Sequence, residues 1–142
     1  MNKVLLVEDN PGDADLTRLA FKEAGLDCEL SVVDSGEQAL DWLLATTDGQ
    51  PAYRPDLILL DLNLPGMHGT ELLDRIKSSS RLQRIPVIVM SSSAAEPDIS
   101  RSYDLHVNSY IQKPMNMAGF IEIARTINEF WLVVAKRPPV PV

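Results

Sequence analysis

Residues 56–69 read DLILLDLNLPGMHG, an aliphatic run that ends on an acidic residue and a turn. Four aliphatic side chains in succession, at residues 57–60, are typical of a strand that is buried on both faces. The run stops at Asp61, and a Pro-Gly pair and a further glycine then mark a turn before a helix at about residues 70–79. The segment therefore predicts a strand–loop–helix unit with a carboxylate at the end of the strand.

The same unit recurs on both sides of this segment. Further strands are predicted at residues 4–7, 29–33, 87–90 and about 109–111, and they alternate with helical patterns near 13–24, 35–44, 97–104 and 117–135. Strands that alternate with helices five times predict βαβ units. We therefore expect one α/β domain, with a doubly wound parallel sheet and helices on both faces.

Composition limits the classes of function. The chain has 142 residues and a formal net charge of −7, from 13 basic and 20 acidic residues. The acidic balance argues against a nucleic-acid partner or an anionic membrane surface, and we expect no apolar run long enough to span a membrane. The single cysteine, Cys28, forms no internal disulfide and suits a reducing, cytoplasmic location. We expect a domain at residues 1–137 and a Pro-rich tail at 138–142.

Polar residues follow four of the five predicted strands. Glu8 and Asp9 follow the first strand, Asp61 the third and Lys113 the fifth, and Ser91 comes at the end of the fourth. In an open parallel sheet, ligands bind outside the carboxyl ends of the strands. Each of these residues taken alone could simply begin a loop. Because all five fall at the same edge, we expect them to converge on one site.

The chemistry of these residues suggests phosphoryl transfer. Three carboxylates in one place repel one another unless a cation neutralises them. A hard divalent ion with oxygen ligands, Mg²⁺ or Mn²⁺, fits this set. His68 and His106 are isolated in the sequence, so no zinc cluster is expected. A lysine beside a metal site suits an incoming phosphate, with one carboxylate as the nucleophile.

Four motifs together resemble the receiver domains of two-component response regulators. They are VEDNP at residues 7–11, DLILLDLNLPGMHG at 56–69, PVIVMSS at 86–92 and YIQKP at 110–114. Each motif alone is weak, but the set covers nearly the whole chain in the right order. The resemblance implies a flavodoxin-like (βα)5 fold, with strand order 2-1-3-4-5 and, in this chain, an extended last helix.

The resemblance also implies a phosphoacceptor and a metal site. Asp61 matches the phosphoacceptor aspartate of the family. Glu8 and Asp9 match the acidic pair that holds Mg²⁺ together with Asp61, and Asn63 would add its backbone carbonyl.

Three further positions match the residues that bind phosphate and transmit the signal. Ser91 matches the switch hydroxyl, Lys113 the lysine that pairs with the phosphate, and Tyr110 the switch aromatic. Pro114 matches a proline that follows a cis peptide bond, so the resemblance implies a cis bond between Lys113 and Pro114.

The family's partner is a sensor histidine kinase, which donates the phosphoryl group. The resemblance implies a signalling protein that catalyses only its own phosphotransfer and dephosphorylation, with a conformational switch on the surface of the fourth helix, fifth strand and fifth helix. Within the family, the chain resembles stand-alone regulators that are paired with bacterial, often cyanobacterial, phytochromes. The features that carry this resemblance are the Asn-Pro-Gly-Asp run at residues 10–13, the long loop at 46–55 and the Phe-Trp-Leu run at 130–132. A phytochrome kinase is therefore the expected donor.

The last predicted helix carries two apolar stripes. One stripe suits the core and comprises Met117, Phe120, Ile121, Ala124, Ile127 and Trp131. Beside it lie Ile123, Phe130 and Val134, which form either part of a wide core face or the seam of a homodimer.

Two other functions are compatible with parts of the pattern. Haloacid-dehalogenase phosphatases also use Asp, Lys and Mg²⁺, but they need an acid two residues after the nucleophile, where this chain has Asn63. A docking domain that works without phosphorylation would not need Asp61 and Lys113 together. The length leaves no room for a DNA-binding output domain, so we expect the signal to pass through the domain's own surface.

Overall fold

The computed structural model of the protein describes residues 2–92, 95–134 and 136. The elements in chain order are β1 (Asn2–Val7), α1 (Pro11–Glu23), β2 (Cys28–Val33), α2 (Gly36–Leu44), β3 (Thr46–Thr47), β4 (Gln50–Pro51), β5 (Leu57–Leu60), α3 (Gly69–Ser78), β6 (Val87–Ser91), α4 (Glu96–Asp104), β7 (Ser109–Gln112), α5 (Met117–Ile127) and the π-helix η1 (Asn128–Val134).

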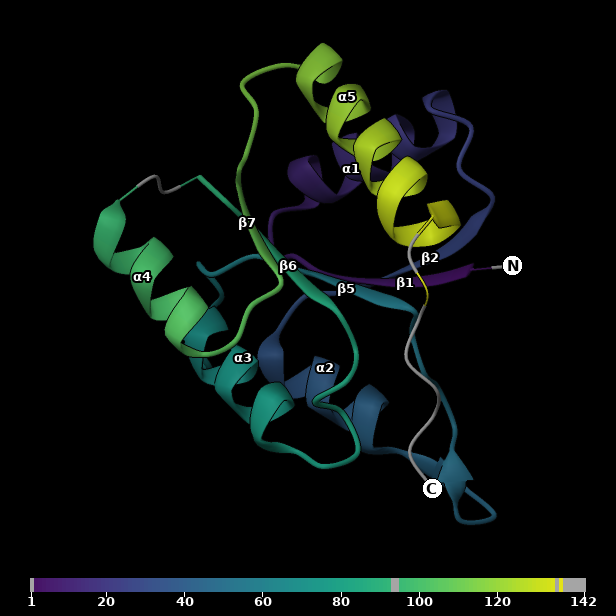
Figure 1. Ribbon diagram of the computed structural model, residues 1–142, viewed down its shortest axis with the longest axis vertical. Coiled ribbons are helices and arrows are strands. Elements are labelled where there is room, and N and C mark those ends of the chain that lie inside the picture. The colour runs from purple at the N-terminus through teal and green to yellow at the C-terminus, as the bar shows by residue number, and fades with distance from the viewer. Residues whose placement is uncertain (1, 93–94, 135, 137–142) are drawn as a thin grey trace.

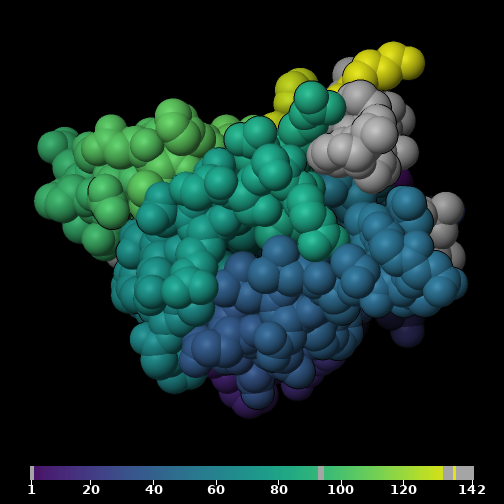
Figure 2. All heavy atoms as spheres, turned by 90° about the horizontal axis from the view of Figure 1, so that it is seen from below, coloured from purple at the N-terminus to yellow at the C-terminus, as the bar shows by residue number. Residues whose placement is uncertain are grey.

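One sheet organises the molecule. Its strands follow the order β2-β1-β5-β6-β7, and each neighbouring pair is parallel. Helices α1 and α5 cover one face, and α2, α3 and α4 cover the other (Figure 1). Figure 2 looks onto the second face, where α2 (blue), α3 (teal) and α4 (green) lie next to one another. Counted within this sheet, the order is the predicted 2-1-3-4-5, and the flavodoxin-like fold is confirmed.

The central strands are buried on both faces. In β1, Leu5 and Val7 pack toward α2 and α3, while Val4 and Leu6 pack toward α1 and α5. All four residues of β5 are fully buried (0% exposed) because β5 lies between β1 and β6 and under helices on both sides. A polar residue at any position of β5 would be buried away from water. The strand is therefore a continuous aliphatic run and does not alternate between apolar and polar residues.

The long connection at residues 46–55 contains a hairpin where the sequence predicted a loop. Strands β3 and β4 pair antiparallel, with Thr46 opposite Pro51 and Thr47 opposite Gln50. Asp48 and Gly49 join them with positive φ angles of 53° and 79°. Asp-Gly is a favoured pair at such two-residue turns because both positions need φ above zero.

The last helix changes its winding before its end. The prediction of one helix to residue 135 is correct from Met117, but the α-helix ends at Ile127 and continues as η1, and Ala135 lies outside the described residues. A π-helix bonds residue i to residue i+5, which shifts the face that it presents. Leu132 therefore enters the core at 7% exposure, although it was not in the predicted core stripe.

The rest of the predicted core stripe lies where it was expected. Phe120, Ala124 and Ile127 are buried between α5 and the sheet. Met117, Ile121 and Trp131 are partly buried against the same cluster. In the part of the chain that the structure describes, no helix is both long and apolar enough to cross a membrane.

A half-buried lysine ties the end of α3 to the sheet. The Lys77 ammonium donates to the carbonyl oxygens of Gln83 (3.2 Å) and Ile85 (2.8 Å) and to Oδ1 of Asn108 (3.2 Å). The same Asn108 oxygen accepts from the backbone N–H of Val87 at 2.8 Å. Burial lowers the pKa of Lys77 to about 8. One side chain thus satisfies three acceptors at the starts of β6 and β7.

We expect Lys77→Met to lower the free energy of unfolding by about 1–3 kcal/mol, because polar acceptors near the core lose their donor. Urea denaturation followed by circular dichroism measures the change. Lys22→Met, at an exposed position of α1, is the matched control and should alter stability by less than about 0.5 kcal/mol. Equal stability of the Lys77 variant and the wild type would contradict this role.

Candidate functional site

The carboxyl edge of the sheet positions the candidate residues. The backbone N–H of Glu8 donates to Val33 O and that of Asp61 to Val7 O, both at 3.0 Å, so the strand ladder extends to these residues. The N–H of Lys113 donates to Ser91 O at 2.7 Å in the same way. The predicted convergence of the acids and the lysine is what this ladder produces.

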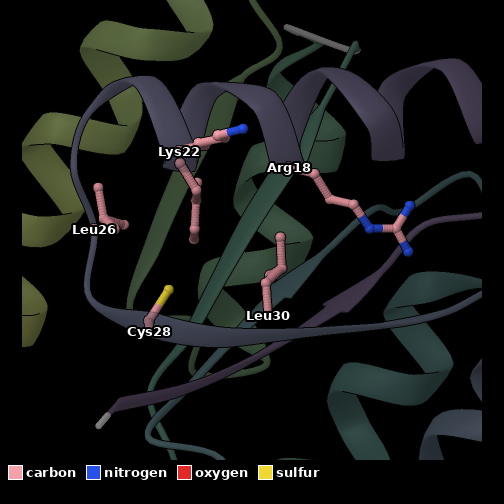
Figure 3. Close-up of a pocket in the computed structure, with 6 residues that line it drawn as sticks. Arg18, Lys22, Leu26, Cys28 and Leu30 are labelled. Atoms are coloured by element: carbon pink, nitrogen blue, oxygen red, sulfur yellow. The ribbon is translucent and has the colours of Figure 1, made fainter.

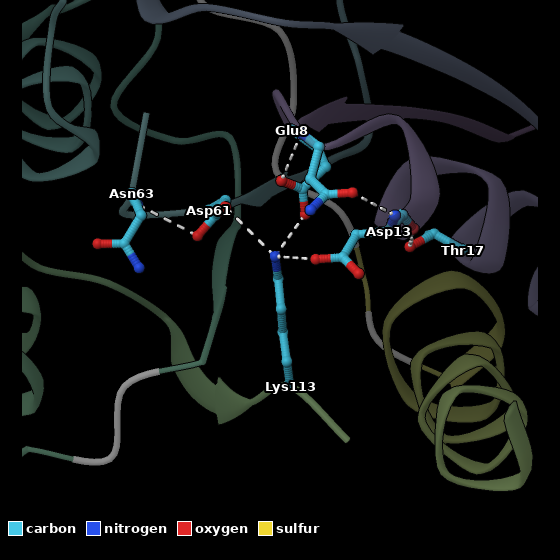
Figure 4. Close-up of polar contacts among 7 residues, drawn as sticks. Glu8, Asp13, Thr17, Asp61, Asn63 and Lys113 are labelled. Carbon is cyan, nitrogen blue, oxygen red and sulfur yellow. Dashed lines mark hydrogen bonds and ion pairs between the residues drawn. The ribbon is translucent and has the colours of Figure 1, made fainter. Parts of the chain in front are cut away.

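Lys113 lies at the centre of the site. Its Nζ is 2.6 Å from Glu8 Oε1, 2.8 Å from Asp13 Oδ2 and 3.2 Å from Asp61 Oδ2 (Figure 4). The side chains of Lys113, Glu8 and Asp61 are only 12%, 3% and 7% exposed. Charges this deeply buried would be costly alone, so each depends on the others for its stability.

The environment shifts the pKa values of the central pair. Burial raises the pKa of Glu8, and the neighbouring Asp61 adds to the rise while Lys113 opposes it. Burial alone would lower the pKa of Lys113, but the hydrogen bonds to Asp13 and Glu8 and the charge of Asp61 together raise it above its usual value. Lys113 therefore stays an ammonium ion in the presence of its three acidic neighbours.

Asp13 is the site residue that the sequence did not predict. It lies in the first turn of α1, where the Asn10 side chain accepts a hydrogen bond from the Asp13 N–H at 3.1 Å. Asn10 and Pro11 are a helix-start signal. A helix that begins after Asn10 brings Asp13, three residues beyond Asn10, close to the strand end that carries Glu8. The helix-start signal could therefore have indicated Asp13.

Three carboxylates form a group that suits a divalent metal. One ligand atom from each of Glu8, Asp9 and Asp61 can be chosen so that all three lie within 4.8 Å of one another. Glu8 and Asp61 are buried, and Asp9 is exposed. An all-oxygen, acidic donor set with an open side fits Mg²⁺ or Mn²⁺, which keep several water ligands.

The loop after Asp61 is held close to the strand end. A Cβ on Gly69 would lie 2.5 Å from Asp61 O and 2.5 Å from Leu62 Cα, so only glycine lets α3 begin here. The Asn63 N–H donates to Asp61 Oδ1 at 3.2 Å, and the Met67 N–H donates to Glu37 Oε1 at 3.2 Å. The loop is thus fixed at both ends, and the metal-ligand role of the Asn63 carbonyl stays a prediction.

The predicted switch residues lie on neighbouring strands. Ser91 is fully buried at the end of β6. Tyr110 lies on β7 opposite Val89, and its ring packs against the core on the α2, α3 and α4 face. Their predicted roles in phosphate binding and switching stay predictions.

The predicted cis peptide bond is not present. The described residues, which include Lys113 and Pro114, contain no cis peptide bond. Even before proline the trans form is intrinsically favoured. Here the backbone bond to Ser91 and the three ion pairs of Nζ direct the lysine into the site without it.

The predicted dimer residues divide between core and surface. Ile123 is half-buried against the core beneath α5. Phe130 is 54% exposed, and its ring packs edge-on against that of Trp131 with centroids 5.3 Å apart. Val134 is the last residue of η1, and its side chain lies outside what the structure describes.

A separate hollow shares no lining residue with the acidic site. It has a volume of about 310 Å³ and is lined by Arg18, Phe21, Lys22, Leu26, Cys28 and Leu30 (Figure 3). Cys28 begins β2 and Lys22 is in the last turn of α1, so this hollow lies toward the amino ends of the strands. No carboxylate lines it, and it takes no part in the metal and phosphate chemistry considered above.

The fold and the site together define a class of protein. A five-stranded parallel sheet carries an acidic pair after its first strand, an aspartate after its central strand and a lysine after its last strand. This is the arrangement that the four sequence motifs predicted. The model of the response regulator receiver domain matches residues 4–125, and the chain belongs to this family.

Individual relatives extend over nearly the whole chain. Response regulator Rcp1 of Synechocystis sp. is 39% identical over 135 residues, which cover 95% of this chain and 92% of Rcp1. The crystal structure of the phosphorylated cyanobacterial phytochrome response regulator RcpA has 46% identity and a TM-score of 0.88, with 97% of this chain and 99% of that chain covered. The Mn²⁺-bound form of Rcp1 has 38% identity and a TM-score of 0.87, with 98% and 100% covered. The resemblance predicted from the sequence is confirmed.

Proposed function

We propose that the protein accepts a phosphoryl group on Asp61 from a sensor histidine kinase and passes the signal on through its own surface. The observation that carries this proposal is the buried Asp61 carboxylate, 3.2 Å from the Lys113 ammonium and grouped with Glu8 and Asp9. This set offers a nucleophile, a cation for the incoming phosphate and ligands for a metal. The residues at 1–137 act as the receiver domain in this proposal.

The transfer is an in-line displacement at phosphorus. A carboxylate oxygen of Asp61 attacks the phosphorus atom of a phosphohistidine, and the phosphorus–nitrogen bond breaks. The imidazole leaves with the electron pair of that bond and takes up a proton from water. Lys113 pairs with the phosphoryl oxygens. A Mg²⁺ ion held by Glu8, Asp9, Asp61 and the Asn63 carbonyl would supply the remaining positive charge.

The switch passes from β6 to β7 and the helices beside them. The new phosphoryl oxygens attract the Ser91 hydroxyl, which would draw the end of β6 inward. Ser91 pairs with Gln112 and Val89 with Tyr110 across these strands, so the movement reaches β7 directly. The surface of α4, β7 and α5 then presents a second state to a partner.

A phytochrome kinase in the cytoplasm is the donor that we favour. The likeness to RcpA, which is named as a cyanobacterial phytochrome response regulator, supports this choice. Phosphotransfer from a panel of purified sensor kinases tests it, and a preference for a kinase without a light-sensing domain would contradict it. The site works stoichiometrically in this proposal, with no second substrate to turn over.

Asp61→Asn should abolish labelling by acetyl phosphate in the presence of Mg²⁺, because an amide oxygen does not form the acyl phosphate. Intact-mass spectrometry counts the phosphoryl groups, with one expected on the wild type. Asp41→Asn, at an exposed position on α2, is the control and should label like the wild type. Equal labelling of the Asp61 variant would refute the assignment of Asp61 as the phosphoacceptor, and a wild type that takes up no label would favour a docking domain that needs no phosphate.

Asp9→Asn should weaken Mg²⁺ binding by about tenfold or more, since one of three acidic ligands loses its charge. Asp9 is exposed, so the substitution leaves no buried group without a partner and the fold should persist. Isothermal titration calorimetry with MgCl₂ measures the affinity. Unchanged affinity would remove Asp9 from the metal site.

We also propose a homodimer through the last helix, supported by the exposed aromatic surface at Phe130. Phe130→Ala should shift the molar mass measured by light scattering from dimer toward monomer. Leu19→Ala, which removes an apolar side chain of similar exposure (47% against 54%) from α1, serves as the control and should leave the mass unchanged. A wild type that is monomeric at high concentration would rule out this seam.

A further inference from the structure

The Lys113 ammonium has no spare donor in this structure. An ammonium group carries three hydrogens, and Nζ has three carboxylate oxygens within 3.2 Å, one each from Glu8, Asp13 and Asp61. The side chain is only 12% exposed, so water contributes little. A phosphoryl oxygen that is to bind Lys113 must therefore displace one of these three contacts.

Asp13 is the contact that has no other part in the proposed chemistry. Asp61 becomes the acyl phosphate, and Glu8 belongs to the group of three acids that suits a metal. Asp13 comes from α1 and lies outside that group, and its side chain is 31% exposed. Its carboxylate is released to water more readily than those of the two buried acids.

The backbone at Asp13 is fixed, so the carboxylate cannot follow the lysine far. The Asp13 N–H is bound by the Asn10 cap at 3.1 Å, and the Asp13 carbonyl accepts from Thr17 Oγ1 at 2.8 Å. Asp13 thus presents its charge from a defined helical turn. A shift of Lys113 toward a phosphoryl group lengthens the contact with Asp13.

We propose that Asp13 is a positioning residue that holds Lys113 in the unphosphorylated state and competes with the phosphoryl group for its ammonium. This inference rests on the proposed phosphoacceptor function of Asp61. Asp13 then acts in opposite directions on two ligands. Its negative charge favours Mg²⁺, and both its charge and its hold on Lys113 oppose the phosphoryl anion.

The test is the substitution Asp13→Asn, which keeps the shape of the side chain and removes the charge. We expect Mg²⁺, measured by calorimetry, to bind about 2- to 5-fold more weakly. We expect beryllofluoride, a stable phosphoryl mimic, to bind about 3- to 10-fold more tightly at saturating Mg²⁺. Effects of opposite sign are not produced by a general loss of structure, which would weaken both ligands.

Asp15→Asn provides the matched control. Asp15 lies two residues after Asp13 on α1. Its side chain is 75% exposed and pairs with Arg18 at 3.2 Å. The substitution makes the same change in net charge outside the site, and both affinities should match those of the wild type. A similar change in affinity in both variants would overturn the direct competition, because it would show an effect of net charge at long range.

The outcomes separate this inference from the function on which it rests. If the wild type binds beryllofluoride and Asp13→Asn binds it equally or more weakly, the competition is overturned and the phosphoacceptor assignment stands. If the wild type neither binds beryllofluoride nor is labelled by acetyl phosphate, the assignment of Asp61 fails and the competition fails with it. If Asp13→Asn binds beryllofluoride more tightly than the wild type and Asp15→Asn does not, the competition is supported.

Discussion

The three ion pairs of Lys113 are the interaction on which the site depends. Its ammonium is held by carboxylates from three separate places in the chain, at the end of β1, in the first turn of α1 and at the end of β5. A buried charge that loses its partner is strongly destabilising. The strand order and the start of α1 bring these groups together, so the fold places each of these charges beside a partner.

The aliphatic strands make that meeting possible. Because β5 has helices on both faces and strands on both sides, its four residues are fully buried and the first polar side chain comes only at Asp61. Gly69 then lets α3 approach the backbone of Asp61 and Leu62 more closely than any side chain would allow. The acid is thus presented at the edge of the sheet by a rigid strand on one side and a close helix start on the other.

These physical constraints explain what could be predicted from the sequence. The buried central strands leave continuous apolar runs, and the change to polar residues at the ends of β1 and β5 marks Glu8 and Asp61. Lys113 follows the edge strand β7, which is only partly buried and itself carries Ser109 and Gln112, so its place was predicted from the alternation of strands and helices. Asp13 left a weaker signal because it lies on a helix, where an acidic first turn has an ordinary explanation in the helix dipole. The π-helix at Asn128–Val134 was not predicted, because the apolar stripe was interpreted with the period of an α-helix. The expected cis bond came from the family resemblance and not from the residues themselves.

A site assembled around one saturated ammonium has a specific consequence for signalling. Lys113 neutralises part of the charge of Glu8, Asp13 and Asp61, and each of the three hydrogens of its ammonium has a carboxylate partner. In the function that we propose, a phosphoryl group on Asp61 would bring further negative charge into the same space, and it would gain Lys113 only as a carboxylate loses it. Phosphorylation would then be an exchange of partners at Lys113 between two arrangements. In this proposal the contact that is released contributes to the free-energy difference between the two arrangements, so a change in that contact would shift the balance of the two states.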